Sequence, residues 1–176
     1  TLYESGSRIA ASVQKLVEES ALATRAAASD PRLAAALESG DPGQISQLCS
    51  QLVTSSGDFD AVFLFDATGR FAGINSVYAD GGQVPPDRIA RIAGADFSKR
   101  EIVAGCVRND ARVEVLEFQT DCDITPALFD SSGLSVARSV PVLNQKGDRV
   151  GVVSTRLHDG QGARHGRGRR GRPARF

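Results

Sequence analysis

The chain has 176 residues, 41% of them hydrophobic, which is enough for one domain with an apolar core. Six of its 21 basic residues are arginines between positions 164 and 175, so residues 1–163 carry 15 basic against 21 acidic residues. An acidic body does not attract nucleic acid or anionic lipid, and no apolar run is long enough to cross a bilayer. Because the first residue is Thr1 and no signal peptide precedes it, we expect the chain to be a piece of a longer protein.

Residues 1–56 have the pattern of helices. Large apolar residues recur at helical spacing from Ile9 to Val17, and the alanine-rich stretch 20–29 continues the pattern, which predicts a long helix over 2–28. Asp30-Pro31 and Asp41-Pro42 predict two short helices, at about 31–38 and 42–55. Asp caps the free backbone N–H groups of a first turn, and Pro fits the first helical position because no N–H is needed there.

After Gly57 the pattern changes to that of strands. An aromatic and β-branched run at 61–65, a turn at 66–69 and a second run at 70–74 predict a hairpin. Further strands are expected at 112–120, 134–143 and 149–157, the last two joined by a turn at 144–148, with Pro141 near a strand end or edge. A short helix is expected at 85–93, and a helical or mixed stretch at 97–107.

This order of elements predicts an α+β fold. Strands joined by short turns favour an antiparallel sheet, here of about five strands, with helices gathered at one end of the chain. Residues 158–176 are mostly Gly and Arg without apolar periodicity, so they cannot bury enough surface to offset their chain entropy. We therefore expect one domain over 1–157, with a helical lead-in over 1–56, a sheet core over 57–157, and a tail over 158–176 that is not part of it.

The chemistry of most enzyme classes is missing from the body of the chain. The two histidines, His158 and His165, fall in or beside the tail, which excludes a catalytic triad or a His-based metal site in the body. No phosphate-binding loop or dinucleotide-binding motif is present, and no pair of carboxylates is singled out by its spacing. The sequence thus predicts a protein that is not an enzyme and that uses no cofactor or metal.

Cysteines and one acidic pair leave alternatives open. Cys49, Cys106 and Cys122 form no CxxC motif, so they are either small buried apolar residues or, for Cys106 and Cys122, a disulfide in a domain outside the cytoplasm. Asp121 and Asp123 flank Cys122 and suit calcium, but without a glycine-containing loop of further oxygen ligands a solvated loop is favoured.

Several segments together resemble the Cache domains, the PAS-like extracytoplasmic sensors also called PDC domains. Residues 63–71, Phe-Leu-Phe-Asp-Ala-Thr-Gly-Arg-Phe, resemble the first hairpin of that family, and 94–101 resemble its ligand-side helix with Gly, Asp, Phe and then Arg. Residues 139–142 and 147–153 resemble its closing hairpin, and 30–33 its helical lead-in. The resemblance extends from Ser7 to Leu157. It departs from the family where Ile102 and Val103 replace the usual aromatic, and where the tail replaces an exit helix.

The resemblance implies a PAS-like central antiparallel sheet, a long N-terminal helix rising from the membrane, and a pocket on one face of the sheet. The family implies a periplasmic sensor domain of an inner-membrane receptor in bacteria, either a histidine kinase or a methyl-accepting chemotaxis protein. Its ligand would be an organic acid or an amino acid, and its signal would pass through the N-terminal helix. A homodimer is expected, and nucleic acid is not an expected partner.

An anionic ligand in such a pocket needs a fixed cation, and the planar fork of Arg holds both carboxylate oxygens. The candidates are Arg100 and Arg138, for which the alternatives are a surface cation on a helix and an outward, solvated Arg on the sheet. The other candidates close the pocket, form its walls, donate hydrogen bonds or bind a ligand amine: Tyr78, Phe65, Phe118, Asn75, Ser139 and Asp123. For the phenylalanines, plain core packing is the alternative.

Three rival functions remain at this point. The Gly/Arg tail is typical of RNA-binding segments, although its one aromatic residue is Phe176. A PAS-like domain can also dimerise without binding any ligand. A hydrolase that uses paired carboxylates is the third.

Overall fold

The computed structural model describes residues 2–56, 59–108, 114–119, 124–129 and 135–158. Three helices come first, α1 (Leu2–Ala28), α2 (Pro31–Ser39) and α3 (Pro42–Ser56), followed by the hairpin of β1 (Ala61–Asp66) and β2 (Phe71–Ile74). The helices α4 (Pro86–Ala93) and α5 (Glu101–Arg108) then lead to β3 (Val115–Gln119) and the short helix α6 (Ile124–Phe129). The chain continues through β4 (Ser135–Leu143) and β5 (Arg149–His158).

The five strands form one antiparallel sheet in the order β2-β1-β5-β4-β3, which confirms the predicted α+β fold. The last strand, β5, lies at the centre, where Val153 pairs with Leu64 of β1 on one side and with Val140 of β4 on the other. The predicted position of Pro141 is confirmed. It pairs with Val152 of β5 but lies beyond the stretch 135–139 that pairs with β3. Its missing N–H therefore removes no hydrogen bond between β4 and β3.

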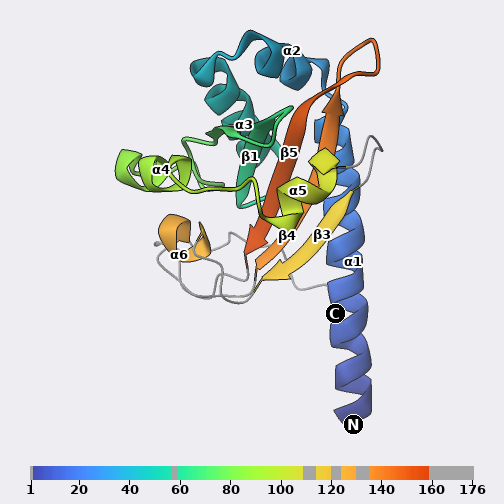
Figure 1. Ribbon diagram of the computed structural model, residues 1–176. Helices are drawn as coiled ribbons and strands as arrows, with labels where there is room; N and C mark the ends of the chain where they lie inside the picture. The colour runs from blue at the N-terminus through green and yellow to red at the C-terminus, as the bar shows by residue number, and fades with distance from the viewer. Residues whose placement is uncertain (1, 57–58, 109–113, 120–123, 130–134, 159–176) are drawn as a thin grey trace.

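Helices cover both faces of the sheet, and alternating residues divide the core between them (Figure 1). On the face of α1, α2 and α3, Val62, Leu64 and Val153 pack against Leu33, Ile45 and other residues of the lead-in. On the face of α4, α5 and α6, Phe63, Phe65 and Val152 pack against Phe97, Ile102 and Leu128. Strand side chains point alternately to the two faces, so each central strand serves both halves of the core.

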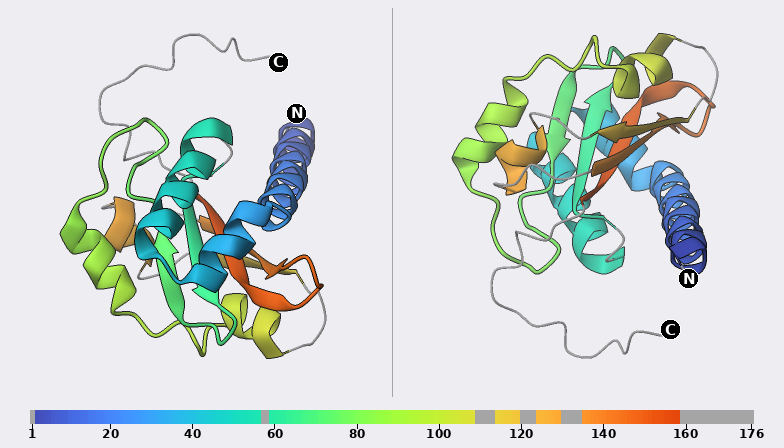
Figure 2. Two further views of the ribbon diagram at one scale, coloured as in Figure 1. Left: turned by 90° about the horizontal axis from the view of Figure 1, so that it is seen from above. Right: turned by 90° about the horizontal axis from the view of Figure 1, so that it is seen from below.

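The first half of α1 extends beyond the sheet, away from the other elements (Figure 2). Its second half packs on β4 and β5. No described helix combines the length and apolarity of a membrane span.

Local signals in the sequence set the helix starts and turns. The Asp30 carboxylate accepts a hydrogen bond from the Arg32 N–H at 2.9 Å, and that of Asp41 from the Gly43 N–H at 2.8 Å, as their capping role predicts. Gly69 closes the β1–β2 turn with φ at +83°, a backbone conformation that a side chain disfavours.

Some details differ from the sequence-based predictions. The stretch 97–107 is helical only from Glu101 onward, and the sequence did not indicate α6. Strand β5 includes His158, while residues 159–176 lie outside the described part of the chain. The proposed Cys106–Cys122 disulfide and the candidate residue Asp123 also lie outside it, because residues 120–123 are not described.

Candidate functional site

A row of polar side chains lies on the sheet face covered by α4, α5 and α6. Ser154 of β5 is opposite Ser139 of β4, and Arg156 is opposite Ala137, so these positions are adjacent in the middle of the sheet. Ser135 lies at the start of β4 on the same face. Ser135, Ser139, Ser154 and Arg156 are 1%, 0%, 1% and 2% exposed. We call these four residues the polar row.

Arg156 is the one charged member of the row. Its flanking partners across the sheet are Ala61 and Ala137, both 0% exposed, and these small side chains leave room for a guanidinium over the sheet. The guanidinium carbon lies 5.4 Å from the centre of the Phe63 ring, and Nη1 donates to the Ser135 hydroxyl at 3.5 Å. An aromatic face stabilises such a cation by a cation–π interaction.

The hydroxyls of Ser139 and Ser154 are buried, and neither has a hydrogen-bond partner among the described residues. A buried hydroxyl without a partner is costly, and most buried polar groups in proteins are satisfied. The row therefore combines a buried cation with two hydrogen-bonding groups available for a further acceptor. Chemically, this arrangement suits a small anion such as a carboxylate.

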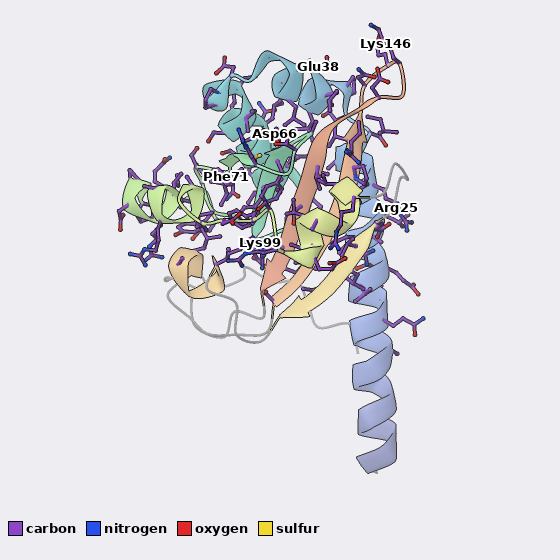
Figure 3. The ribbon with its side chains drawn as sticks, in the orientation of Figure 1. Arg25, Glu38, Asp66, Phe71, Lys99 and Lys146 are labelled. Atoms are coloured by element: carbon purple, nitrogen blue, oxygen red, sulfur yellow. The ribbon has the colours of Figure 1, made fainter. Side chains whose placement is uncertain are left out.

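The candidate residues Phe65 and Ser139 lie on this face. Phe65 belongs to a cluster of aromatic rings with Phe63, Phe71 and Phe97, whose centroids are 5.1 to 6.5 Å apart. Arg100 lies at the edge of this cluster, with its guanidinium carbon 5.0 Å from the centre of the Phe97 ring. Figure 3 labels Phe71 at this cluster.

Tyr78 and Asn75 make contacts with the backbone. The Tyr78 hydroxyl donates to the Leu128 carbonyl oxygen of α6 at 2.8 Å, and Arg88 of α4 donates to the same oxygen at 2.7 Å. The Asn75 side chain accepts from the Val62 N–H at 2.9 Å and donates to the Val77 carbonyl oxygen at 2.8 Å. Tyr78 thus helps to hold α6 on the face of the polar row, whereas Asn75 stabilises the chain after β2.

The structure places Arg138 on the opposite face of the sheet, towards α1. There it pairs with Glu114, and its Nη2 donates to the Val17 carbonyl oxygen at 3.1 Å. Its side chain is 8% exposed, and burial followed by the nearby charge of Arg25 lowers the pKa of the guanidinium from its ordinary value. Arg138 therefore does not lie together with Phe65 and Ser139. Phe118 belongs to β3, opposite Val136, and its side chain lies outside the described part of the structure.

Arg156 is not among the site residues predicted from the sequence, because the face that each side chain of 149–157 occupies was not assigned. The signal was present: in the predicted strand 149–157, Arg156 alternates in phase with Val152 and Ser154. Which of the two faces this phase occupies depends on the pairing with β1 and β4.

Among the described residues, two of the clefts on the surface lie away from the polar row. One, of about 270 Å³, is lined by residues of α2 and α3 that include Leu33 and Leu48. The other, of about 300 Å³, lies beside α5 and is lined by residues that include Thr68 and Lys99.

Comparison with solved structures identifies the fold. The ligand-binding domain of the Pseudomonas fluorescens chemoreceptor CtaA, solved with L-serine, has a TM-score of 0.54 and 23% identity, over 89% of this chain and 57% of that one. The fold is that of the Cache-type sensor domains. The sensor domain of the Vibrio cholerae histidine kinase DctB has a TM-score of 0.57 and 17% identity, over 86% of this chain and 51% of that one.

The Escherichia coli DcuS sensor domain has a TM-score of 0.56 and 13% identity, over 82% of this chain and 89% of that one. The chain thus spans just over half of the CtaA and DctB domains, and most of the DcuS domain. No protein-family model matches the sequence, and no curated protein matches it. The predicted resemblance to Cache domains is confirmed at the level of the fold.

Proposed function

We propose that this chain is the extracytoplasmic ligand-binding domain of a bacterial signal receptor, and that its ligand is a small carboxylate or amino acid. The receptor would be a chemoreceptor or a histidine kinase, anchored in the membrane and dimeric. In this proposal residues 1–157 form the sensor domain, residues 158–176 lie outside it, and the domain binds without catalysing a reaction. The acidic charge of residues 1–163 argues against nucleic acid as the partner.

The observation that carries this proposal is the polar row. Arg156 takes the role that the sequence suggested for Arg138 and binds the carboxylate of the ligand, while Ser139 and Ser154 donate hydrogen bonds to it. Two features support this assignment: Arg156 is 2% exposed between two alanines, and the two hydroxyls have no partner among the described residues. A domain of the same fold was solved with L-serine bound.

Burial of the polar row ties binding to a conformational change. Its members are 2% exposed or less, so a ligand reaches Arg156 only when the cover on this face opens. A ligand that binds one conformation better than another shifts the population between them. Such a shift is what a receptor needs in order to report that its ligand is present.

Thermal unfolding of the chain with a panel of L-serine, L-alanine, γ-aminobutyrate and succinate tests the proposal. A compound present at 100 times its Kd stabilises the folded state by about 2.7 kcal/mol, which corresponds to a rise in Tm of roughly 5–10 °C for a chain of this size. Arg156→Gln should abolish that rise, and Arg156→Lys should weaken it.

Arg32→Gln is the matched control, because Arg32 is an exposed arginine that pairs with Asp30 on α2. It should retain the full rise, and circular dichroism shows whether each variant is folded. A compound that binds Arg156→Gln as tightly as the unmodified chain would contradict the assignment of the site. The absence of binding by any compound would contradict the ligand class and favour a module that only dimerises.

A further inference from the structure

Over residues 20–28, helix α1 contacts the rest of the molecule through small and polar side chains. Among its described residues, those buried against the rest of the molecule are Ser20, Ala21, Thr24, Ala27 and Ala28. Leu22, the large apolar residue of this segment, points outward and is 67% exposed. Alanines bury little apolar area, and apolar contacts have no strict direction, so they do little to define where the helix sits along the sheet.

Three polar contacts define that position instead. Nη2 of Arg138 donates to the Val17 carbonyl oxygen at 3.1 Å, and the hydroxyls of Thr24 and Thr155 are hydrogen-bonded at 2.7 Å. Arg138 also pairs with Glu114, which in turn accepts from Nε of Arg25 at 2.7 Å. Figure 3 labels Arg25 on α1, beside the sheet.

The two anchors on the sheet are neighbours, because Arg138 of β4 pairs with Thr155 of β5. Arg138 contacts α1 at Val17, and Thr155 contacts it at Thr24. These two positions are seven residues apart, which is about 10 Å along the helix. A shift of the helix by one residue moves it about 1.5 Å and turns it by about 100°, which would break these contacts. Arg138, at 8% side-chain exposure, would then be left as a buried charge with fewer partners.

Each anchor is also adjacent in sequence to the polar row. Arg138 precedes Ser139, and Thr155 lies between Ser154 and Arg156. Because successive side chains on a strand point to opposite faces, a backbone shift that accommodates a molecule at Ser139 and Arg156 also moves Arg138 and Thr155. The two faces of the sheet are thereby linked through single peptide units of β4 and β5.

We infer that Arg138 is a positioning residue that, together with Glu114 and Thr155, sets the place of α1 on the sheet and passes a change at the polar row to that helix. The use of this link in signalling rests on the proposed function. The anchoring of α1 by Arg138 does not, so the two can fail separately.

Hydrogen–deuterium exchange of the 176-residue chain, without any added compound, tests the anchor. Arg138→Met keeps an unbranched apolar stem but removes the guanidinium, and with it the charge and the donors. We expect backbone amides at 17–28 of α1 to exchange at least about tenfold faster in this variant, while those of α3 at 42–56 keep their rates. Arg138→Lys should recover part of the protection, because it restores the charge and a donor group, but without the planar fork of the guanidinium.

Arg108→Met is the matched control, since Arg108 also pairs with a glutamate, Glu101, but lies on α5. It should leave the exchange of α1 unchanged. If Arg138→Met does not fold, Glu114→Gln removes the same ion pair and should raise the exchange of α1 in the same direction. Unchanged exchange of α1 in a folded variant, or an equal increase in every element, would overturn the inference.

The link between the faces is tested by Ser139→Thr, which adds one methyl group at the polar row. This substitution should change the exchange rates of α1 by a few-fold in the otherwise unmodified chain, and should add no further change when combined with Arg138→Met. If Ser139→Thr has no effect on α1 in the otherwise unmodified chain, or the same effect with and without Arg138→Met, then Arg138 does not pass a change at the polar row to α1. Loss of binding in Arg156→Gln reports on the proposed function alone.

Discussion

Removal of either unpartnered hydroxyl should make the domain more stable and a weaker binder. Ser139 and Ser154 are 0% and 1% exposed, and their hydroxyls have no partner among the described residues. A buried polar group without a partner costs about 1–3 kcal/mol, and Ser→Ala deletes only Oγ while keeping Cβ in place. We therefore expect Ser139→Ala and Ser154→Ala each to raise the free energy of unfolding by about 1 kcal/mol, or Tm by about 2–4 °C.

The same substitutions should lower the affinity for the compound that binds. Loss of one hydrogen bond of about 1 kcal/mol corresponds to a roughly fivefold rise in Kd. Urea unfolding gives the stability of the free domain, and calorimetry gives Kd. A binding site commonly shows this opposition between stability and function, because its groups are arranged for a ligand rather than for the fold.

Ser50→Ala is the matched control for the stability measurement. The Ser50 hydroxyl donates to the Ser46 carbonyl oxygen at 2.7 Å and accepts from the Ser76 N–H at 2.9 Å, so its removal should cost about 1 kcal/mol. If Ser139→Ala proved as destabilising as Ser50→Ala, the Ser139 hydroxyl would be a structural group, and the reasoning that places a ligand beside it would be refuted.

Two further substitutions test the packing and the turns. A Cβ on Gly73 would lie 2.5 Å from Cγ2 of Ile45, so Gly73→Ala should lower the free energy of unfolding in urea by about 1–3 kcal/mol. Adding Ile45→Leu, which lacks Cγ2, should recover part of this loss. No loss of stability in Gly73→Ala alone would contradict this packing. Burial alone would raise the pKa of the Asp66 carboxyl, but hydrogen bonds from Thr68 and from the Arg70 N–H outweigh burial and hold the pKa below its ordinary value. A carboxyl with a lowered pKa stabilises the folded state above about pH 4, and this stabilisation is lost as the pH falls through the folded-state pKa. Asp66→Ala should therefore lower the free energy of unfolding by about 1 kcal/mol at pH 7 and by less at about pH 3. An equal loss at both pH values would show that the charge of Asp66 plays no part.

Neighbouring residues were sufficient to predict the local structure. Asp30 and Asp41 cap helices, and Gly69 and Gly147 close turns at positive φ, as expected from residues only a few positions apart. The short turns between the predicted strands likewise predicted an antiparallel sheet, and the order of motifs indicated the Cache-type fold. Helix α6 was missed because it is only six residues long, too short to show a helical period.

The assignment of the two arginines depended on the tertiary structure. Arg138 and Arg156 look alike in sequence, each an arginine between two uncharged residues of a strand, and alternation specifies only that neighbours face opposite ways. The pairing of β5 between β1 and β4 puts Arg156 on the face of the polar row and Arg138 against α1. The partners that give each guanidinium its role, Glu114 and Val17 for one and Phe63 and Ser135 for the other, come from distant parts of the chain. Contacts of that kind form only when the whole sheet assembles, which is why periodicity along the sequence does not reveal them.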